Sequence, residues 1–274
     1  MTLRITHFVL SCAVAAVLSF AASAQASVEM KFLQINPAGG LGSVGLSFNG
    51  DLVAGTIGQQ IWDVRNETGT PELQLIDIAD GDGQADNLIS FCIELSQYVK
   101  GSWQDYDKGL LAAAPDPFLA GAPGYVIGAD RAAALDLLAD NYWAAATGSN
   151  LVDAIAFQLA IWEIVHEDPS GPTDNPPLAA TLDVSDNQGT FFVTNDSPSG
   201  DLATAIGVAN SWLGSLPSLT GNDSLSLMAL MHPTQQDQIV QLQANPEPAT
   251  MMVWGVLVAG VLVRTNRQKR SLQG

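Results

Sequence analysis

The chain has 274 residues and carries 28 acidic side chains against 10 Lys and Arg, which gives a formal net charge of −18 at neutral pH. This acidity excludes a typical nucleic-acid-binding or anionic-lipid-binding protein, because such proteins present clusters of basic side chains to their partners. Acidic exported proteins remain soluble in an extracellular matrix, so the composition is compatible with that location.

The first 26 residues have the three parts of a secretion signal. Arg4 supplies a positive charge, the apolar run Phe8–Phe20 follows, and the small residues at 22–26 offer two cleavage sites of the A-x-A form. The apolar run is too short to cross a bilayer with any margin. We therefore predict a signal peptide at 1–26, removed by signal peptidase after export through the Sec pathway. An uncleaved anchor is the alternative.

The residues from 28 to 99 are expected to form strands and turns. Apolar residues alternate at the start of this region, and two apolar runs, Leu73–Ile78 and Leu88–Leu95, flank a polar loop. The loop contains Asp-Gly pairs, which are typical of β-hairpins. Alternating carboxylates can also bind Ca²⁺, but the glutamate that closes a calcium loop is missing. We predict a hairpin and no cofactor; the alternative is a structural calcium ion bound by Asp80, Asp82 and Asp86.

The centre of the chain is expected to be helical. Ala-rich segments with helical spacing predict helices at 131–146, 150–167 and 201–216. Closing strands are expected at 225–231 and 238–242. The succession of strands, helices and strands predicts an α+β fold in which a β-barrel or sandwich carries a helical subdomain. We expect one domain at 27–243, since its length suffices for one large core.

The last 31 residues, 244–274, combine three features. Pro246, Glu247 and Pro248 precede the apolar run Met251–Val263, and a cluster of Lys and Arg ends the chain. As a helix, the apolar run would rise about 20 Å, less than the ~30 Å hydrocarbon core of a bilayer. It is therefore expected to be a thin or transient anchor, with its basic end on the cytoplasmic side.

This terminus resembles the PEP-CTERM sorting tail of Gram-negative bacteria that make exopolysaccharide. The resemblance implies recognition by an exosortase, an integral membrane cysteine peptidase or transpeptidase, and a transient inner-membrane intermediate. The protein would then reach the cell surface or the extracellular matrix. An ordinary C-terminal anchor that contains Pro-Glu-Pro by chance is the alternative.

Cysteine usage points to one unusual residue. Cys12 lies within the predicted signal peptide, so Cys92 is the one cysteine of the exported region. Cysteines in oxidising compartments normally occur in even numbers, as disulfides. The residues alone leave three interpretations open: a buried inert thiol, an intermolecular disulfide, or a thiol protected by other chemistry.

Two short segments together resemble the bacterial thioester domain of the TQXA type. The first, Phe91-Cys92-Ile93-Glu94, places an aromatic residue before the cysteine and an apolar residue after it. The second, Phe157–Trp162, has an apolar residue, Gln158, two further residues, an apolar residue and Trp162. Residues 235–241 resemble, less closely, the Gln-containing closing strand of that family.

The resemblance implies an internal thioester between Cys92 and Gln158, formed with loss of ammonia. An amine on a surface or matrix partner would displace Cys92 and become joined to Gln158, a single-turnover adhesion rather than enzyme turnover. Trp162 lies one helical turn after Gln158 and either shields the bond or is plain core. Glu94 is expected on the same face of its strand as Cys92, where it transfers a proton or is a solvated rim carboxylate.

The alternative function is a passive exopolysaccharide or biofilm matrix protein with a buried, unreacted cysteine. A hydrolase finds little support, because the chain has only three histidines and none forms a convincing triad with a nucleophile and an acid. His166 is expected at the C-terminal end of its helix, near the negative end of the helix dipole.

Overall fold

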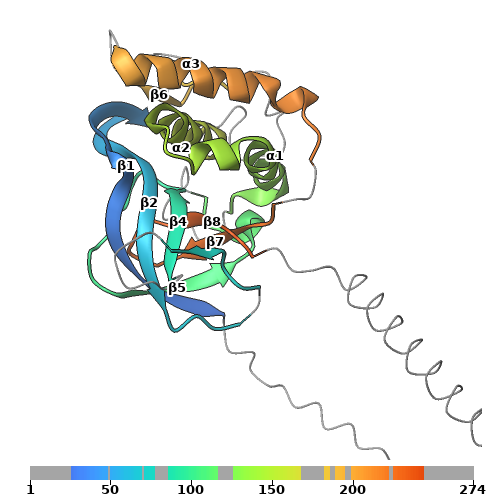
Figure 1. Cartoon of the computed structure of the whole chain (residues 1–274). Helices are drawn as coiled ribbons and strands as arrows, with labels where there is room; N and C mark the ends of the chain where they lie inside the picture. Colours follow the sequence, from blue (N-terminus) through green and yellow to red (C-terminus); the bar gives the residue numbers. More distant parts are fainter. Residues whose placement is uncertain are drawn as a thin grey trace, which may run out of the picture.

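The computed structural model describes a barrel of strands with helices packed on one side of it (Figure 1). The described residues are 26–48, 50–69, 71–77, 86–116, 126–167, 182–185, 189–194, 199–221 and 225–243. The predicted signal peptide up to residue 25, Asp80 and Asp82, and the predicted sorting tail from 244 onwards lie outside these ranges.

Six antiparallel strands close into the barrel, in the order β2-β1-β5-β7-β8-β4 with β4 returning to β2. They are β1 (Ser27–Phe48), β2 (Asp51–Arg65), β4 (Asn87–Cys92), β5 (Gln104–Gly109), β7 (Leu227–Met231) and β8 (Gln238–Gln241). The α+β prediction is confirmed, and of the two predicted β-architectures the barrel is the one observed. Register shifts interrupt the pairing of β1 with β2 at three places, and such bulges bend a strand enough to wrap round a barrel.

Two short strands extend the sheet beyond the closed barrel. β3 (Leu75–Ile76) pairs antiparallel with β4, as the predicted hairpin requires, although the loop between them lies outside the described residues. β6 (Phe191–Val193) pairs with the end of β1.

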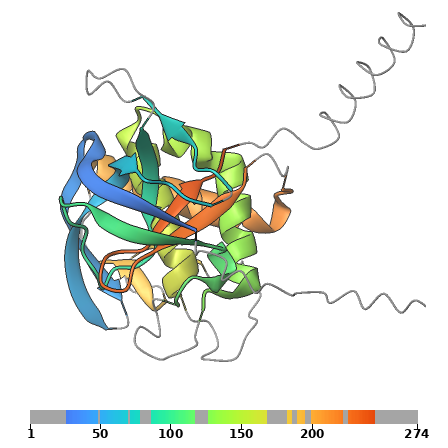
Figure 2. The same cartoon turned by 90° about the horizontal axis from the view of Figure 1, so that it is seen from below.

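The helices are α1 (Gly128–Ala146), α2 (Leu151–His166) and α3 (Gly200–Ser215), close to the predicted ranges. α2 begins at Asn150, whose Oδ1 accepts a hydrogen bond from the amide of Val152 at 3.1 Å. The helix is mostly apolar and is buried from residue 154 to its end, including the polar residues Gln158, Glu163 and His166, because it lies between the barrel strands and the other two helices. Figure 2 shows from below how the strands wrap round one another, with the helices beyond and beside them. None of the described helices is long and apolar enough to span a membrane.

The apolar side chains form two cores separated by the barrel wall. One fills the barrel and includes Trp62, Leu88 and Tyr106; the other lies between the wall and the helices and includes Phe91 and Phe157. Side chains alternate between the two faces of β4, so Leu88 belongs to the barrel and Phe91 to the helix side. The end of β4 is therefore where both cores meet.

Candidate functional site

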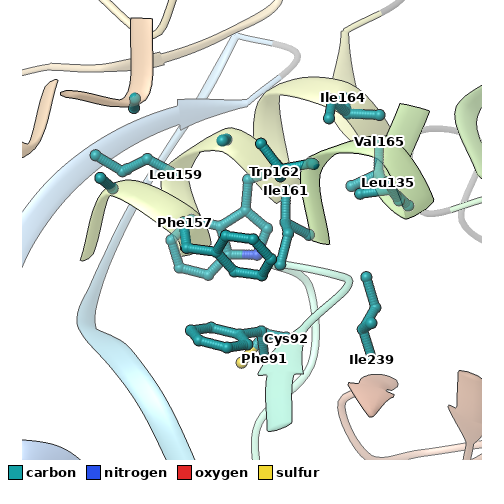
Figure 3. Packing of buried hydrophobic residues seen from close by; sticks show 14 of the residues in the cluster. Phe91, Cys92, Leu135, Phe157, Leu159, Ile161, Trp162, Ile164, Val165 and Ile239 are labelled. Atoms are coloured by element: carbon teal, nitrogen blue, oxygen red, sulfur yellow. The ribbon is translucent and has the colours of Figure 1, made fainter. Parts of the chain in front are cut away.

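Cys92 is the last residue of β4 and is 5% exposed. Its strand is paired on both sides, with Ser90 opposite Gln60 of β2 and Cys92 opposite Gln238 of β8. Phe91 points toward α2, where its ring centroid lies 4.8 Å from that of Phe157. Figure 3 shows Phe91 and Cys92 together at the end of β4, below the labelled side chains of α2. The Cys92 side chain shares its face of β4 with Ser90, whose hydroxyl binds Trp62 in the core of the barrel. The strand therefore directs the sulfur toward the barrel interior.

Gln158 holds the backbone of Cys92. The Cys92 amide donates to Gln158 Oε1 at 2.8 Å, and Gln158 Nε2 donates to the Cys92 carbonyl at 2.8 Å. The structure thus brings the two motif residues together, but it does not place the Gln158 amide on the sulfur. The predicted Cys92–Gln158 thioester stays a prediction: in this structure the side-chain amide of Gln158 binds the backbone of Cys92 and not its sulfur. Both ends of the Gln158 amide are already occupied by the backbone.

Two other glutamines contact the sulfur. The Cys92 thiol donates to Gln236 Oε1 at 2.9 Å, and Gln60 Nε2 donates to Cys92 Sγ at 2.7 Å. Gln60 Nε2 also lies 3.3 Å from Gln236 Oε1, while Gln236 Nε2 donates to the carbonyl of Glu94. Gln236 falls within the segment that the sequence had singled out at 235–241. Gln60 carried no sequence signal, since its place depends on the β2–β4 register.

A polar layer supports these contacts inside the barrel. Ser90 Oγ accepts a hydrogen bond from Trp62 Nε1 and donates to Gln238 Oε1, both at 2.7 Å. Gln238 Nε2 donates in turn to the carbonyl of Gln236 at 3.0 Å. These bonds fix the loop that carries Gln236 against the end of β4.

Glu94 and Asp237 are buried carboxyls near the end of β4, 5% and 3% exposed, and the charge of Glu94 acts on the Cys92 thiol. Glu94 Oε1 accepts from the Asp237 amide at 3.4 Å, and Asp237 Oδ1 accepts from the His232 amide at 2.7 Å. Burial, and then the charge of Asp237, raises the pKa of Glu94 to about 7, and burial raises the pKa of Asp237 to about 7. The alternative of a solvated rim carboxylate for Glu94 is therefore wrong.

The thiol itself is held in its protonated form. Burial raises the pKa of Cys92 above its ordinary range, and the charge of Glu94 adds to that effect. A free Cys92 is thus a weak nucleophile at neutral pH unless a neighbouring base removes its proton. Glu94, whose charge acts on the thiol, is the candidate for that base.

Trp162 is 3% exposed and belongs to the core between the barrel and the helices. Its ring lies edge-on to Phe191, with centroids 6.1 Å apart. Phe157 is the aromatic residue of the second motif that packs on Phe91, the neighbour of the cysteine. The packing supports the interpretation of Trp162 as plain core.

His166 ends α2 as predicted, but it is fully buried between the rings of Phe48 and Phe191. Burial, and then the positive charge of Arg131, lowers the pKa of His166 to about 3. The imidazole is therefore neutral and gains little from the helix dipole.

No group of three His, Cys, Asp or Glu side chains suited to a metal ion occurs within the described part of the chain. Two of the three candidate calcium ligands, Asp80 and Asp82, lie outside that part, while Asp86 lies inside it. Comparison of the chain with protein-family models, curated proteins and solved structures found no match.

Proposed function

We propose that this chain is an exported surface protein that forms an internal thioester between Cys92 and Gln236 and captures an amine on a partner. The observation that carries the proposal is the 2.9 Å contact between Cys92 Sγ and Gln236 Oε1 within a buried site. The signal-like start and the Pro246-Glu247-Pro248 tail support export, exosortase sorting and a place at the cell surface or in its matrix.

Bond formation begins with attack of the sulfur on the side-chain carbonyl carbon of Gln236. A carboxylate, Glu94 or Asp237, takes the thiol proton and returns it to the departing amide nitrogen, so that a C–S bond forms, a C–N bond breaks and ammonia leaves. Gln60 Nε2, 3.3 Å from Gln236 Oε1, is placed to stabilise the oxyanion of the tetrahedral intermediate. The fold supplies the proximity that makes a poor electrophile react.

The product is a buried thioester, which is an acylating group. An amine that reaches the thioester carbonyl forms an amide with the Gln236 side chain and releases Cys92 as a thiol. Each molecule reacts once, so the proposed activity is covalent adhesion rather than enzyme turnover.

A passive matrix protein is the second candidate. The burial of Cys92 and the raised pKa of its thiol favour it, since a buried and protonated cysteine is chemically inert. Under this hypothesis the glutamines around the sulfur are only hydrogen-bonding partners.

The mass of the intact protein, purified without amines, decides between the two. We expect the wild type to be lighter than its sequence by one ammonia, and Cys92→Ser and Gln236→Ala to lack that deficit. Gln241→Ala removes a half-buried glutamine of β8 and serves as the matched control, which keeps the deficit.

Peptide mapping of the unreduced protein identifies the bonded residue. A cross-linked peptide joining Cys92 to Gln236 supports the proposal, whereas one joining Cys92 to Gln158 restores the pairing implied by the motifs. A cross-link to Gln60 moves the bond to β2. A wild type with the full sequence mass and a free, titratable thiol refutes the thioester and supports the passive matrix protein.

A further inference from the structure

A relay of hydrogen bonds runs from the core of the barrel to Gln236. It begins at Trp62 of β2, whose Nε1 donates to Ser90 Oγ at 2.7 Å. Ser90 Oγ donates to Gln238 Oε1 at 2.7 Å, and Gln238 Nε2 donates to the backbone carbonyl of Gln236 at 3.0 Å. Trp62, Ser90 and Gln238 are each 0% exposed, so water does not compete for these bonds. A role of this relay in bond formation rests on the proposed function, in which Gln236 is the glutamine of the thioester.

The direction of every bond in the relay is set by its two ends. An indole N–H only donates, and a backbone carbonyl only accepts. Ser90 Oγ therefore accepts from Trp62 and has one proton left, which it donates to Gln238 Oε1. The amide of Gln238 must then turn its Nε2 toward the carbonyl of Gln236. If this amide were reversed, two acceptor oxygens would face each other, so the donor at Trp62 selects one orientation of the whole relay.

Trp62 is a rigid starting point for the relay. Its ring lies edge-on to Phe32 on one side and to Tyr106 on another, with centroids 5.5 Å and 5.8 Å apart. A large side chain packed in this way in a dense core has little freedom to rotate. The direction of its N–H is therefore fixed by the barrel core.

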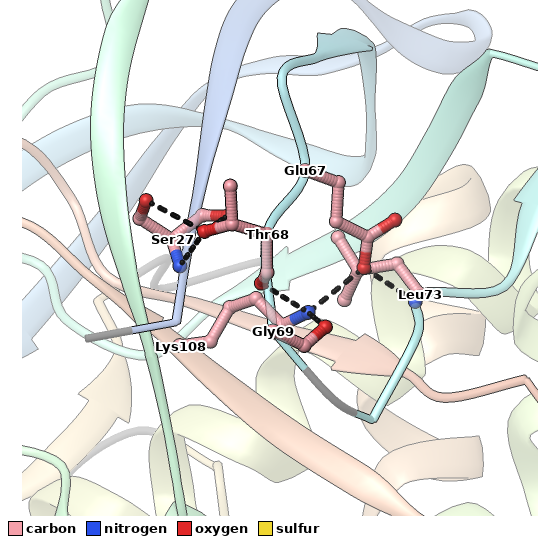
Figure 4. Close-up of polar contacts among 6 residues, drawn as sticks. All are labelled: Ser27, Glu67, Thr68, Gly69, Leu73 and Lys108. Carbon is pink, nitrogen blue, oxygen red and sulfur yellow. Dashed lines mark hydrogen bonds and ion pairs between the residues drawn. The ribbon is translucent and has the colours of Figure 1, made fainter. Parts of the chain in front are cut away.

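Lys108 also points inward from the barrel wall, but it does not compete for the acceptors of the relay. Its ammonium donates to the carboxylate of Glu67 and to the carbonyls of Thr68 and Gly69 (Figure 4). An ammonium has three donors, and these contacts use all of them. The relay therefore keeps Trp62 as its donor.

The relay holds one part of Gln236 while its side chain faces the sulfur. Gln238 binds the backbone carbonyl of Gln236, and the carbonyl of Glu94 binds its Nε2. The remaining Oε1 lies 2.9 Å from the Cys92 sulfur. Gln238 is also the cross-strand partner of Cys92, so the residue that holds Gln236 is itself in register with the nucleophile. Because a displacement of about 1 Å can slow a reaction that depends on proximity roughly a hundredfold, bond formation should be sensitive to these contacts.

We propose that Trp62 and Ser90 are positioning residues for thioester formation, and that through Gln238 they hold Gln236 so that its side-chain carbonyl meets the Cys92 sulfur. They exchange no atom or proton with the reacting groups, and the bonds made and broken are those of the proposed thioester.

The test breaks the relay at two points and follows the ammonia deficit in the intact mass. The full chain is collected unfolded in urea, before the bond has formed, and is folded by dilution. Ser90→Ala removes the hydroxyl, and Trp62→Phe removes the indole N–H but keeps an aromatic ring. We expect each variant to form the bond about ten- to a hundredfold more slowly than the wild type once it has folded, as for a displaced reacting group.

Two controls separate positioning from a general loss of stability. Trp162→Phe also removes a buried indole, but Nε1 of Trp162 has no hydrogen-bond partner in the described structure. Ser47→Ala removes the hydroxyl of a buried serine of β1 that lies outside the relay. Both controls should form the bond at the wild-type rate. Urea unfolding of each variant in a Gln236→Ala background, in which no bond forms, measures how much stability it has lost.

Bond formation at the wild-type rate in folded Ser90→Ala and Trp62→Phe overturns the inference, and so does a slowing equal to that of the two controls at similar losses of stability. A wild type that never shows the ammonia deficit overturns the proposed function itself, so the two failures are distinguishable. If neither variant folds, Gln238→Glu decides. Its carboxyl can donate to the Gln236 carbonyl only while it is protonated, so its rate relative to the wild type must fall as the pH rises; a constant ratio refutes the relay.

Discussion

Replacing Gln158 by Leu is expected to lower the free energy of unfolding by about 2–6 kcal/mol. The substitution keeps most of the side-chain volume but removes both hydrogen bonds to the Cys92 backbone. Each backbone group left buried without a partner costs about 1–3 kcal/mol, and two are affected. Gln158 is 1% exposed, so water cannot readily replace the lost amide.

Equilibrium unfolding in urea measures this loss. The comparison is made in a Gln236→Ala background, because a cross-link in one protein and not the other would change the unfolded state. Gln59→Leu is the control: Gln59 is also fully buried, but its one described hydrogen bond is a 3.3 Å contact from Nε2 to the Gly148 carbonyl.

If the two hydrogen bonds from Gln158 stabilise the backbone of Cys92, Gln158→Leu must destabilise the protein clearly more than Gln59→Leu. A loss below about 1 kcal/mol, the value of an ordinary hydrogen bond, would refute it, as would equal losses in the two variants.

Three further predictions concern buried polar groups. Burial raises the pKa of Glu163 from 4.5 to about 9, so between these pH values the folded state keeps a proton that the unfolded state has released. The stability of the wild type therefore falls as the pH rises from 4.5 to about 9. Glu163→Gln removes this titration and should make the melting temperature less dependent on pH. Lys108→Met should cost about 2–3 kcal/mol in urea unfolding, since Glu67 keeps its charge and is only 19% exposed. Tyr106→Phe should raise the free energy of unfolding in urea by up to about 1 kcal/mol, because it removes a buried hydroxyl that has no hydrogen-bond partner in the described structure.

The helices were predictable because their apolar content is dense and their ends are marked. α2 combines an Asn cap with a nearly continuous apolar sequence, and such a helix is buried wherever it lies. β5, in contrast, was missed. Its sequence QDYDKG is polar, and the inward side chains are Tyr106 and Lys108, the latter satisfied only by groups from a loop 40 residues away.

Barrel closure depends on pairings that local patterns do not encode. The β2–β4 register sets Gln60 opposite Ser90, and the β4–β8 register sets Cys92 opposite Gln238. Only these registers bring Gln60 and Gln236 to the sulfur.

The sequence motifs indicated correctly that the elements carrying Cys92 and Gln158 meet. They did not indicate which atoms meet. The side chain of the last residue of a strand points to one face of the sheet, whereas its backbone amide and carbonyl can bind a different element. The helix therefore reaches the amide and carbonyl of Cys92 and leaves the sulfur to the barrel side.

The groups around the Cys92 sulfur determine how the rate of thioester formation depends on pH. The pKa of the Cys92 thiol lies well above neutrality, so its own ionisation cannot control the rate between pH 6 and 8, whereas Glu94 and Asp237 both titrate near 7. These carboxyls accept the thiol proton only when they are ionised, and the charge of Asp237 acts on Glu94 as the charge of Glu94 acts on the thiol.

Thioester formation during refolding should therefore speed up about tenfold from pH 6 to pH 8, as a single carboxyl ionises. The rate is followed by the appearance of the ammonia deficit in the intact mass. Glu94→Gln should flatten the profile if Glu94 is the base, and Asp237→Asn should flatten it if Asp237 is. A wild-type rate that does not change with pH would mean that neither carboxyl takes the proton, and the polar layer around the sulfur would then act through hydrogen bonding alone.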